Sequence, residues 1–240
     1  MVKPLDITAI TALVADACEG LGRDVSAEPI LQAMQRDLYD GVPITEVRKS
    51  LVLAARGLIE QDPGYSFVTA RLLLHTLRLE TLGEEVAQAQ MNRRYAEYLP
   101  RFVQLGIEAD LIDERLAKYD LKCLGAALDA TRDLKFTYLG LQILYDRYFL
   151  HVQGRRIELP QIFFMRVAMG LALNEPEDQR EARAIEFYNV LSSFDFMSST
   201  PTLFNSGTRR SQLASCYLTT VADDRSEEHT SELQSHVRSR

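Results

Sequence analysis

The stretch TPTLFNSGTRRSQLASCYLTT, residues 200–220, carries the residue types best suited to chemistry in this chain. The lone thiol of Cys216 follows a turn-forming Asn-Ser-Gly sequence at 205–207 and lies inside an alternating run, SQLASCYLTTV. Such alternation predicts a β-strand, with Ala214, Cys216, Leu218 and Thr220 on one face. Small residues around a thiol leave room for another molecule to approach. Taken alone, Cys216 would be interpreted as a small buried apolar residue, so its surroundings must decide.

The segments before this stretch are predicted to be mostly helical. Apolar residues recur at helical spacing in about 6–22, 26–38, 45–58 and 65–82, with Asp6 and Ser26 as expected N-caps. Four short amphipathic helices can form a small bundle. Further helices are expected over 83–100, 108–118, 137–149, 160–173 and 180–194, and a β-hairpin around Gly154.

Composition excludes several classes of protein. The 240 residues are 46% hydrophobic and 25% charged, as in soluble globular proteins. A net charge of −7 argues against a dedicated nucleic-acid binder. No apolar run approaches the length of a signal peptide core or a membrane span. The three cysteines are too few and too scattered for a disulfide framework, so we expect a reducing cytoplasm.

The last sixteen residues, RSEEHTSELQSHVRSR at 225–240, differ in composition from the rest. RSEEHTSELQS resembles the translation of a sequencing-library adapter joined in frame to a gene. We therefore expect a non-native tail and a native sequence that runs on beyond Asp224. His229 and His236 lie in this tail, and nothing around them predicts a metal site.

Longer motifs give a family resemblance. STPTLFNSGTRRSQLASCYL resembles the start of the catalytic barrel in the large (α) subunit of class I ribonucleoside-diphosphate reductase. DLKFTYLGLQILYDRYFL and IELPQIFFMRVAMGLAL resemble the helical region before that barrel. YDGVPITEVRKSLVLAARGLI and ARLLLHTLR resemble helices of the family's ATP-cone. The resemblance covers nearly all of 6–224.

The resemblance implies a mainly α fold. It predicts a degenerate ATP-cone-like helical domain at 1–90, a helical domain at 91–195 and the first strand of a ten-stranded α/β barrel in 196–224. The chain would be an N-terminal fragment of the subunit, inactive alone. The alternative is a stand-alone helical regulatory or interaction module without catalysis.

The resemblance also implies a chemistry. The family removes the 2′-hydroxyl of a ribonucleoside diphosphate after a thiyl radical abstracts a ribose hydrogen, and two further thiols become a disulfide. Cys216 matches one of that pair. Thr200, Thr202 and Ser215 match positions around the substrate diphosphate, where hydroxyls donate hydrogen bonds. The Asn-Ser-Gly turn is expected to bring backbone N–H groups close to a phosphate. Asp224 matches the start of the specificity-effector site.

Partners and cofactors follow from the same resemblance. We expect no cofactor or metal in this chain itself. The family's large subunit takes ATP and dNTP effectors, a radical from a metal-containing small (β) subunit, and electrons from thioredoxin or glutaredoxin. It forms a homodimer at full length. No nucleic acid or membrane is expected to bind.

The chain departs from the family at the cone. The basic, glycine-bearing hairpin that usually opens the cone is missing before MVKPLDI. Ile44 occupies a position that is often a nucleotide-contacting Thr, with Thr45 next, and Leu79 occupies one where some members use Lys. We therefore expect weak or no ATP binding.

Several other residues invite a functional interpretation but are better explained by packing. These are Cys18 and Cys123 in helical patterns, a satisfied interior or boundary His75, and the pair Tyr95 and Tyr98. Arg209 and Arg210 are expected to be solvated turn residues.

Overall fold

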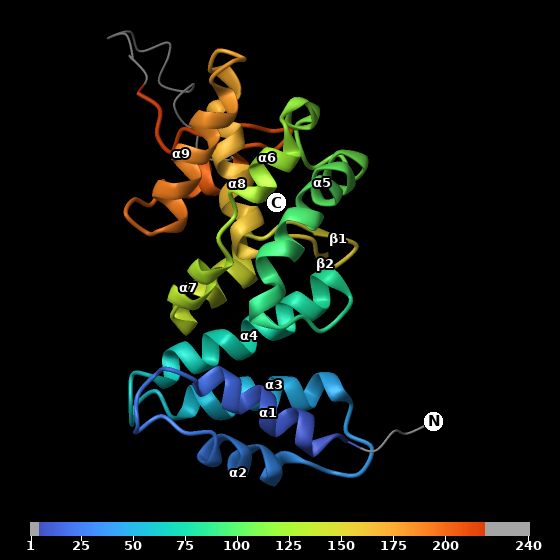
Figure 1. Ribbon diagram of the computed structural model, residues 1–240, viewed down its shortest axis with the longest axis vertical. Helices are drawn as coiled ribbons and strands as arrows, with labels where there is room; N and C mark the ends of the chain where they lie inside the picture. Colours follow the sequence, from blue (N-terminus) through green and yellow to red (C-terminus); the bar gives the residue numbers. More distant parts are fainter. Residues whose placement is uncertain (1–4, 219–240) are drawn as a thin grey trace, which may run out of the picture.

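The computed structural model describes residues 5–218, which form two groups of helices that meet at α4 (Figure 1). The first group comprises α1 (Ile7–Cys18), α2 (Glu28–Asp37) and α3 (Ile44–Gly57), and it leads into α4 (Tyr65–Leu82). The second comprises α5 (Met91–Glu108), α6 (Leu121–Ala126), α7 (Tyr138–Ile143), α8 (Pro160–Leu171), α9 (Arg180–Ser192) and α10 (Thr200–Asn205). Short turns connect them: η1 (Gln88–Gln90), η2 (Glu114–Lys118), η3 (Ala130–Lys135), the π-helical η4 (Leu144–Tyr148) and η5 (Ala172–Asn174). The predicted mainly helical fold is confirmed.

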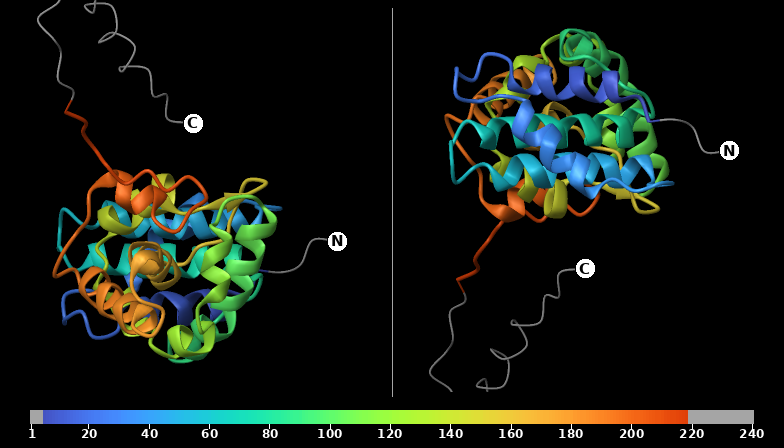
Figure 2. Two further views of the ribbon diagram at one scale, coloured as in Figure 1. Left: turned by 90° about the horizontal axis from the view of Figure 1, so that it is seen from above. Right: turned by 90° about the horizontal axis from the view of Figure 1, so that it is seen from below.

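The first group is a small bundle built as its apolar spacing predicts. Asp6 caps α1 by accepting a hydrogen bond from the Ala9 amide at 2.9 Å. Ile10, Val14 and Ala17 form the buried stripe of that helix. From below, α1, α3 and α4 run side by side (Figure 2). Their facing side chains enclose one apolar core.

Helix α4 belongs to two cores at once, so it buries apolar residues on more than one side. Val68 and Leu72 pack into the core of the first group. Leu73 and Leu77 pack into the larger core of the second. The helix has its predicted bounds and ends at Gly83, whose φ of 80° is the left-handed conformation that closes a helix without a Cβ clash. The predicted division of the chain near residue 90 remains a prediction.

Helix α8 is the centre of the second group. Its first ten residues, Pro160 to Met169, are all buried. Two of them are polar, Gln161 and Arg166, and both have no solvent exposure. A helix buried on all sides must satisfy such groups inside the protein. The partners of these two side chains therefore determine what packs around α8.

The predicted hairpin is confirmed as β1 (His151–Val152) paired antiparallel with β2 (Arg155–Arg156). Gln153 and Gly154 connect the strands with positive φ angles of 51° and 79°, as a type I′ turn requires. The hairpin is held against the end of α4, because Arg156 pairs with the Glu80 carboxylate at 3.2 Å. Arg155 donates to the backbone carbonyl of Thr81 at 3.1 Å.

The predicted helix boundary at Pro100 is wrong, because α5 runs through this residue to Glu108. A proline in a helix leaves the carbonyl four residues earlier without its usual donor, and here that residue is Ala96. Gly125 of α6 packs against the Ala96 backbone, and a Cβ on it would lie 3.1 Å from the Ala96 carbonyl oxygen. The freed backbone therefore becomes a close helix contact.

Two further boundaries differ from the prediction. Ser26 does not cap α2, since its backbone N–H and C=O both contact the Tyr65 hydroxyl at 3.2 Å and the helix begins at Glu28. The expected helix over 108–118 is interrupted at Asp110, which has a φ of 61°. Only the 3₁₀ turn η2 follows, capped by the Asp113 side chain. Within 5–218, no helix is long and apolar enough to cross a membrane.

His75 on α4 is half-buried, and its Nδ1 atom lacks a hydrogen-bond partner among the described residues. His75 thus lies at the boundary of the core as expected, whereas the expectation that it is satisfied is wrong. Burial lowers the pKa of His75; nearby Glu85 raises it, while Arg48 and Arg78 lower it further. The folded state thus binds this proton less readily than the unfolded chain, whose histidine pKa is about 6.5. Its contribution to stability is fully present above that value and is lost as the pH falls below it.

We predict that His75→Gln reduces the loss of unfolding free energy between about pH 7.5 and about pH 5.5, measured by urea denaturation. His151→Gln is the control, because His151 is exposed on the hairpin. It should keep the full loss seen in the unaltered chain. An equal pH dependence in all three proteins would contradict the assignment.

Candidate functional site

The threonines of the candidate site, Thr200 and Thr202, lie in the first turn of α10. Pro201 fits this turn because the first N–H groups of a helix need no intrahelical partner. The Thr200 hydroxyl lies 3.2 Å from the Tyr148 hydroxyl. Thr202 lies 3.2 Å from the Ser199 hydroxyl and donates to the Leu213 carbonyl at 3.4 Å. The structure therefore brings the two threonines together and links Thr202 to the segment that leads to Cys216.

The Asn-Ser-Gly turn after α10 packs onto α8, which corrects the expectation that its backbone faces a phosphate. Gly207 has a φ of 74° and is buried. It lies so close to Gly170 that a Cβ on Gly170 would be 2.0 Å from the Gly207 nitrogen. Ser206 donates its hydroxyl proton to the Val167 carbonyl at 2.7 Å. Gly170 permits this close approach of the two backbones because it has no Cβ.

A second contact fixes the turn from the side of η2. Thr208 forms an isolated β-bridge with Ile112. The Asp113 amide donates to the Gly207 carbonyl at 3.1 Å, and the Arg209 amide donates to the Leu111 carbonyl at 3.0 Å. The Arg209 side chain forms an exposed ion pair with Asp110. Residues 206–209 are thus held on both sides, and Arg210 faces solvent as predicted.

The predicted strand around Cys216 is absent, since residues 211–218 have no regular secondary structure. A strand needs a neighbour to accept and donate its backbone hydrogen bonds, and the described residues provide none for this segment. Asn205 anchors its start by donating to the Gln212 carbonyl at 2.7 Å. Ser215 and Cys216 are exposed, and neither side chain makes a hydrogen bond within residues 5–218.

Two predictions fall beyond the described residues. Asp224, the candidate effector residue, and the tail at 225–240 both lie outside the range 5–218. The prediction that 196–224 begins a catalytic barrel is not tested by residues 5–218 either. These assignments stay predictions.

The other two cysteines have different surroundings. Cys18 is half-buried at the end of α1, and burial raises the pKa of its thiol although Arg71 lowers it. A packing role fits Cys18. Cys123 is exposed on α6, so the expectation that it packs inside is wrong. An exposed thiol away from the candidate site makes Cys123 a useful control.

A pocket of about 390 Å³ lies beside α10, and no sequence motif had indicated it. Phe136, Ile143, Tyr148, Phe194, Met197 and Leu203 provide most of its lining. Tyr148 also stacks on Phe204, with ring centroids 4.3 Å apart. Tyr148 belongs to a run that predicted only an amphipathic helix, and no local signal marked its contact with Thr200.

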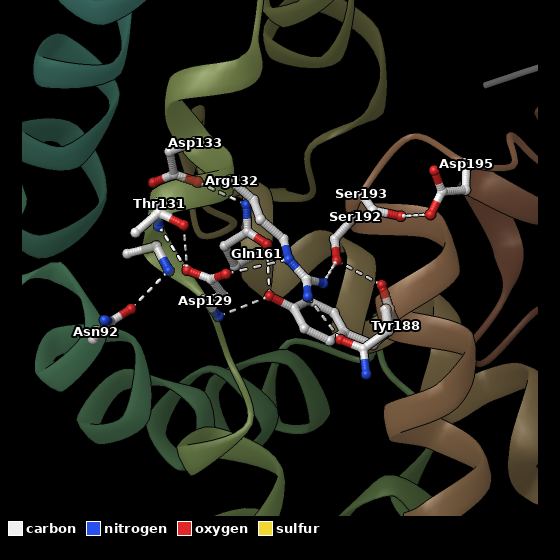
Figure 3. A network of polar contacts seen from close by, with 12 residues as sticks. Asn92, Asp129, Thr131, Arg132, Asp133, Gln161, Tyr188, Ser192, Ser193 and Asp195 are labelled. Carbon is white, nitrogen blue, oxygen red and sulfur yellow. Dashed lines mark hydrogen bonds and ion pairs between the residues drawn. The ribbon is translucent and has the colours of Figure 1, made fainter.

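A buried polar network surrounds Gln161 near the start of α8 (Figure 3). The Asp133 carboxylate accepts hydrogen bonds from Tyr95 at 2.8 Å and Gln161 at 2.8 Å, and it pairs with Arg78 at 2.9 Å. Tyr188 of α9 donates to Gln161 at 2.7 Å. Burial raises the pKa of Asp133, while Arg78, Gln161 and Tyr95 oppose this rise by stabilising the anion. The predicted packing role of Tyr95 is confirmed.

The same network reaches the surface through η3 and α9. Arg132 donates to the Ser192 hydroxyl and to Asn189, and its guanidinium lies over the Tyr188 ring (Figure 3). The Asp129 amide donates to the Tyr188 hydroxyl at 2.9 Å. α8 and α9 are thus held together by polar contacts as well as by apolar packing.

Comparison with known proteins identifies relatives. Residues 134–211 match the family model described as ribonucleotide reductase, all-alpha domain. The chain is 44% identical over 215 residues to the ribonucleoside-diphosphate reductase subunit alpha of Chlamydia muridarum, covering 90% of this chain and 20% of that protein. It is 36% identical to the subunit alpha of Helicobacter pylori over 93% of this chain and 27% of that protein. The large subunit of Danio rerio is 34% identical over 90% of this chain and 26% of its own length. The chain thus spans about a quarter or less of these relatives.

We predict that Gly170→Ala lowers the free energy of unfolding by about 1–3 kcal/mol, because the added methyl group would overlap the Gly207 backbone. Gly57→Ala at the end of α3 is the control, since a Cβ there meets nothing within 4 Å. It should leave the stability unchanged or raise it by up to about 1 kcal/mol. Chemical denaturation of the three proteins measures both effects. Wild-type stability in Gly170→Ala would contradict the packing described for the turn.

Proposed function

Because the chain belongs to the family of ribonucleoside-diphosphate reductase large subunits, we propose that it forms part of an enzyme that reduces ribonucleoside diphosphates to 2′-deoxyribonucleoside diphosphates. The observation that carries this proposal is the similarity over nine-tenths of the chain, which includes the α10 segment. The chain spans only 20% of the Chlamydia relative, so we propose that the reaction also needs residues outside this chain.

In this proposal Cys216 is one of two thiols that reduce the ribose. A thiyl radical, formed with the help of a metal-containing partner subunit, abstracts a ribose hydrogen and returns it at the end of the reaction, which regenerates the radical. The C2′–O bond then breaks and the hydroxyl leaves as water. The two thiols provide two electrons and two protons and become a disulfide, which thioredoxin or glutaredoxin reduces by thiol–disulfide exchange. The exposed position of Cys216 is compatible with contact to both a substrate and a second thiol.

The hydroxyl groups near the thiol would bind the substrate. Thr200 and Thr202 lie in the same first turn of α10, and both can donate to phosphate or ribose oxygens. Ser215 is exposed next to Cys216. Thr202 is bound to the Leu213 carbonyl in the structure, so substrate would have to compete for that hydroxyl. Asp224 would contact a specificity effector.

The remaining assignments are also part of the proposal. The complete enzyme would be a homodimer in the cytoplasm, regulated by ATP and deoxynucleoside triphosphates. Ile44 is an exposed apolar residue at the start of α3, and Leu79 is half-buried on α4. Neither side chain can donate to a phosphate, so these positions favour weak or absent ATP binding by the first helical group.

We predict that this chain shows no saturable binding of labelled ATP below about 1 mM, the range in which binding free energy is only about −4 kcal/mol. Fluorescence titration or calorimetry measures it. A dissociation constant in the micromolar range would contradict the prediction and would indicate that other residues of the first group bind the nucleotide.

A chimera tests the catalytic proposal. This chain through Leu218 replaces the aligned region of the Chlamydia muridarum subunit, and deoxynucleotide formation is measured with its partner subunit and a dithiol reductant. We predict activity for the chimera and a loss on the order of a thousand-fold for Cys216→Ser, because the thiol takes part in the reaction. Cys123→Ser, which removes another exposed thiol, should retain activity.

Each outcome of the chimera experiment separates the hypotheses. Unchanged turnover in Cys216→Ser would overturn the redox role. A chimera that folds and dimerises like its parent but makes no deoxynucleotide would favour the alternative of a helical regulatory or interaction module.

A further inference from the structure

A second buried ion pair lies on the side of α8 that faces α10. Glu158, just before α8, and Arg166 within it are both fully buried. The Arg166 Nε atom donates to the Glu158 carboxylate at 2.6 Å. Burial of two charges requires close pairing and further hydrogen bonds, because water is excluded. The remaining guanidinium donors therefore need protein partners.

All of these remaining partners lie at the end of α10 or just after it. Arg166 Nη1 donates to the Ser206 carbonyl at 2.6 Å and lies 3.4 Å from the Phe204 carbonyl. Nη2 lies 3.3 Å from the Leu203 carbonyl. The last carbonyls of a helix have no intrahelical donor and carry partial negative charge. The guanidinium thus caps α10 from a neighbouring helix.

Glu158 fixes the orientation of that cap. Its carboxylate also accepts a hydrogen bond from the Leu150 amide at 2.8 Å, so both of its oxygens are engaged. The planar guanidinium lies 5.2 Å from the centroid of the Phe163 ring, which adds an attraction between cation and aromatic face. A guanidinium held in this way can direct two donors at defined points, whereas a lysine ammonium cannot span them.

Stability alone does not account for this arrangement. A buried ion pair is often no more stabilising than apolar side chains of similar volume. The pair Arg78–Asp133 is nearly as buried, with 7% and 0% side-chain exposure, and its partners lie on other elements of the same core. Arg166 differs because every donor not used by Glu158 contacts the backbone of 203–206.

We propose that Arg166, oriented by Glu158, is a positioning residue for the substrate-binding threonines and for the segment that carries Cys216. This inference rests on the proposed function. The guanidinium sets the position of the C-terminal end of α10, and Thr202 lies one residue before the first carbonyl that the guanidinium contacts. Through Thr202 and Asn205, α10 in turn holds the carbonyls of Leu213 and Gln212.

The first test uses the chain as it is. Hydrogen exchange of the backbone amides is compared for Arg166→Lys, Arg78→Lys and the unaltered protein. We expect amides of 206–209 to exchange at least about tenfold faster in Arg166→Lys, relative to amides of α9, because hydrogen bonds from a charged group are lost. Arg78→Lys, the matched buried control, should change both segments together.

The second test uses the chimera and separates positioning from folding. Arg166→Lys should raise the KM for ribonucleoside diphosphate about tenfold or more and lower kcat, since Thr202 is displaced. Arg78→Lys should leave the KM near that of the parent chimera. If Arg166→Lys does not fold, Glu158→Gln replaces it, because the amide keeps one acceptor but holds the guanidinium less firmly. Its shifts in exchange and KM should have the same direction and be smaller.

The outcomes are distinct from those that test the proposed function. An active chimera in which Arg166→Lys and Glu158→Gln behave like Arg78→Lys in exchange and in KM would overturn the positioning role. An inactive parent chimera would instead count against the proposed function. In that case, faster exchange of the 206–209 amides in Arg166→Lys would still support Arg166 as the residue that holds this segment. Unchanged exchange of these amides would refute this role.

Discussion

The burial of the first ten residues of helix α8, Pro160 to Met169, is the constraint on which the second half of the structure depends. A buried helix cannot turn its polar side chains to water, so each must find a protein partner. Gln161 meets this need through Asp133 and Tyr188, and Arg166 meets it through Glu158 and the end of α10. The elements around α8 are thus placed by hydrogen-bond directions as well as by apolar contact. This gives the candidate site a more rigid base than packing alone would provide.

Helix α4 connects the two groups of helices by packing into the core of each. Because it contributes Val68 to one core and Leu77 to the other, the first bundle cannot shift without disturbing the second. Arg156 of the hairpin binds Glu80 near the end of α4 and strengthens this junction.

Local sequence signals predicted the elements whose cause is local. The apolar spacing of α4 predicted its bounds, Asp6 predicted the start of α1, and Gly154 predicted the hairpin. The errors share a different origin, which is contact between residues far apart in the chain. Gly125 of the neighbouring helix packs against the Ala96 backbone that Pro100 frees, and Gly170 is required because a Cβ on it would overlap the Gly207 backbone. Neither partner could be identified from spacing.

The candidate site shows the same division most clearly. The sequence motif predicts Thr200 and Thr202 as site residues, and the structure places both in the first turn of α10. No sequence signal indicates the role of Arg166, because an arginine within an apolar helix has no recognisable spacing to carbonyls that lie 37 to 40 residues later. The strand expected at Cys216 depends on a neighbouring strand to complete its hydrogen bonds. Alternation of side chains predicts which residues face each side of a strand once the strand is paired. Pairing itself depends on residues far away in the chain. In a site built by such contacts, the local motif predicts the chemical groups, whereas residues far away in the chain determine their geometry.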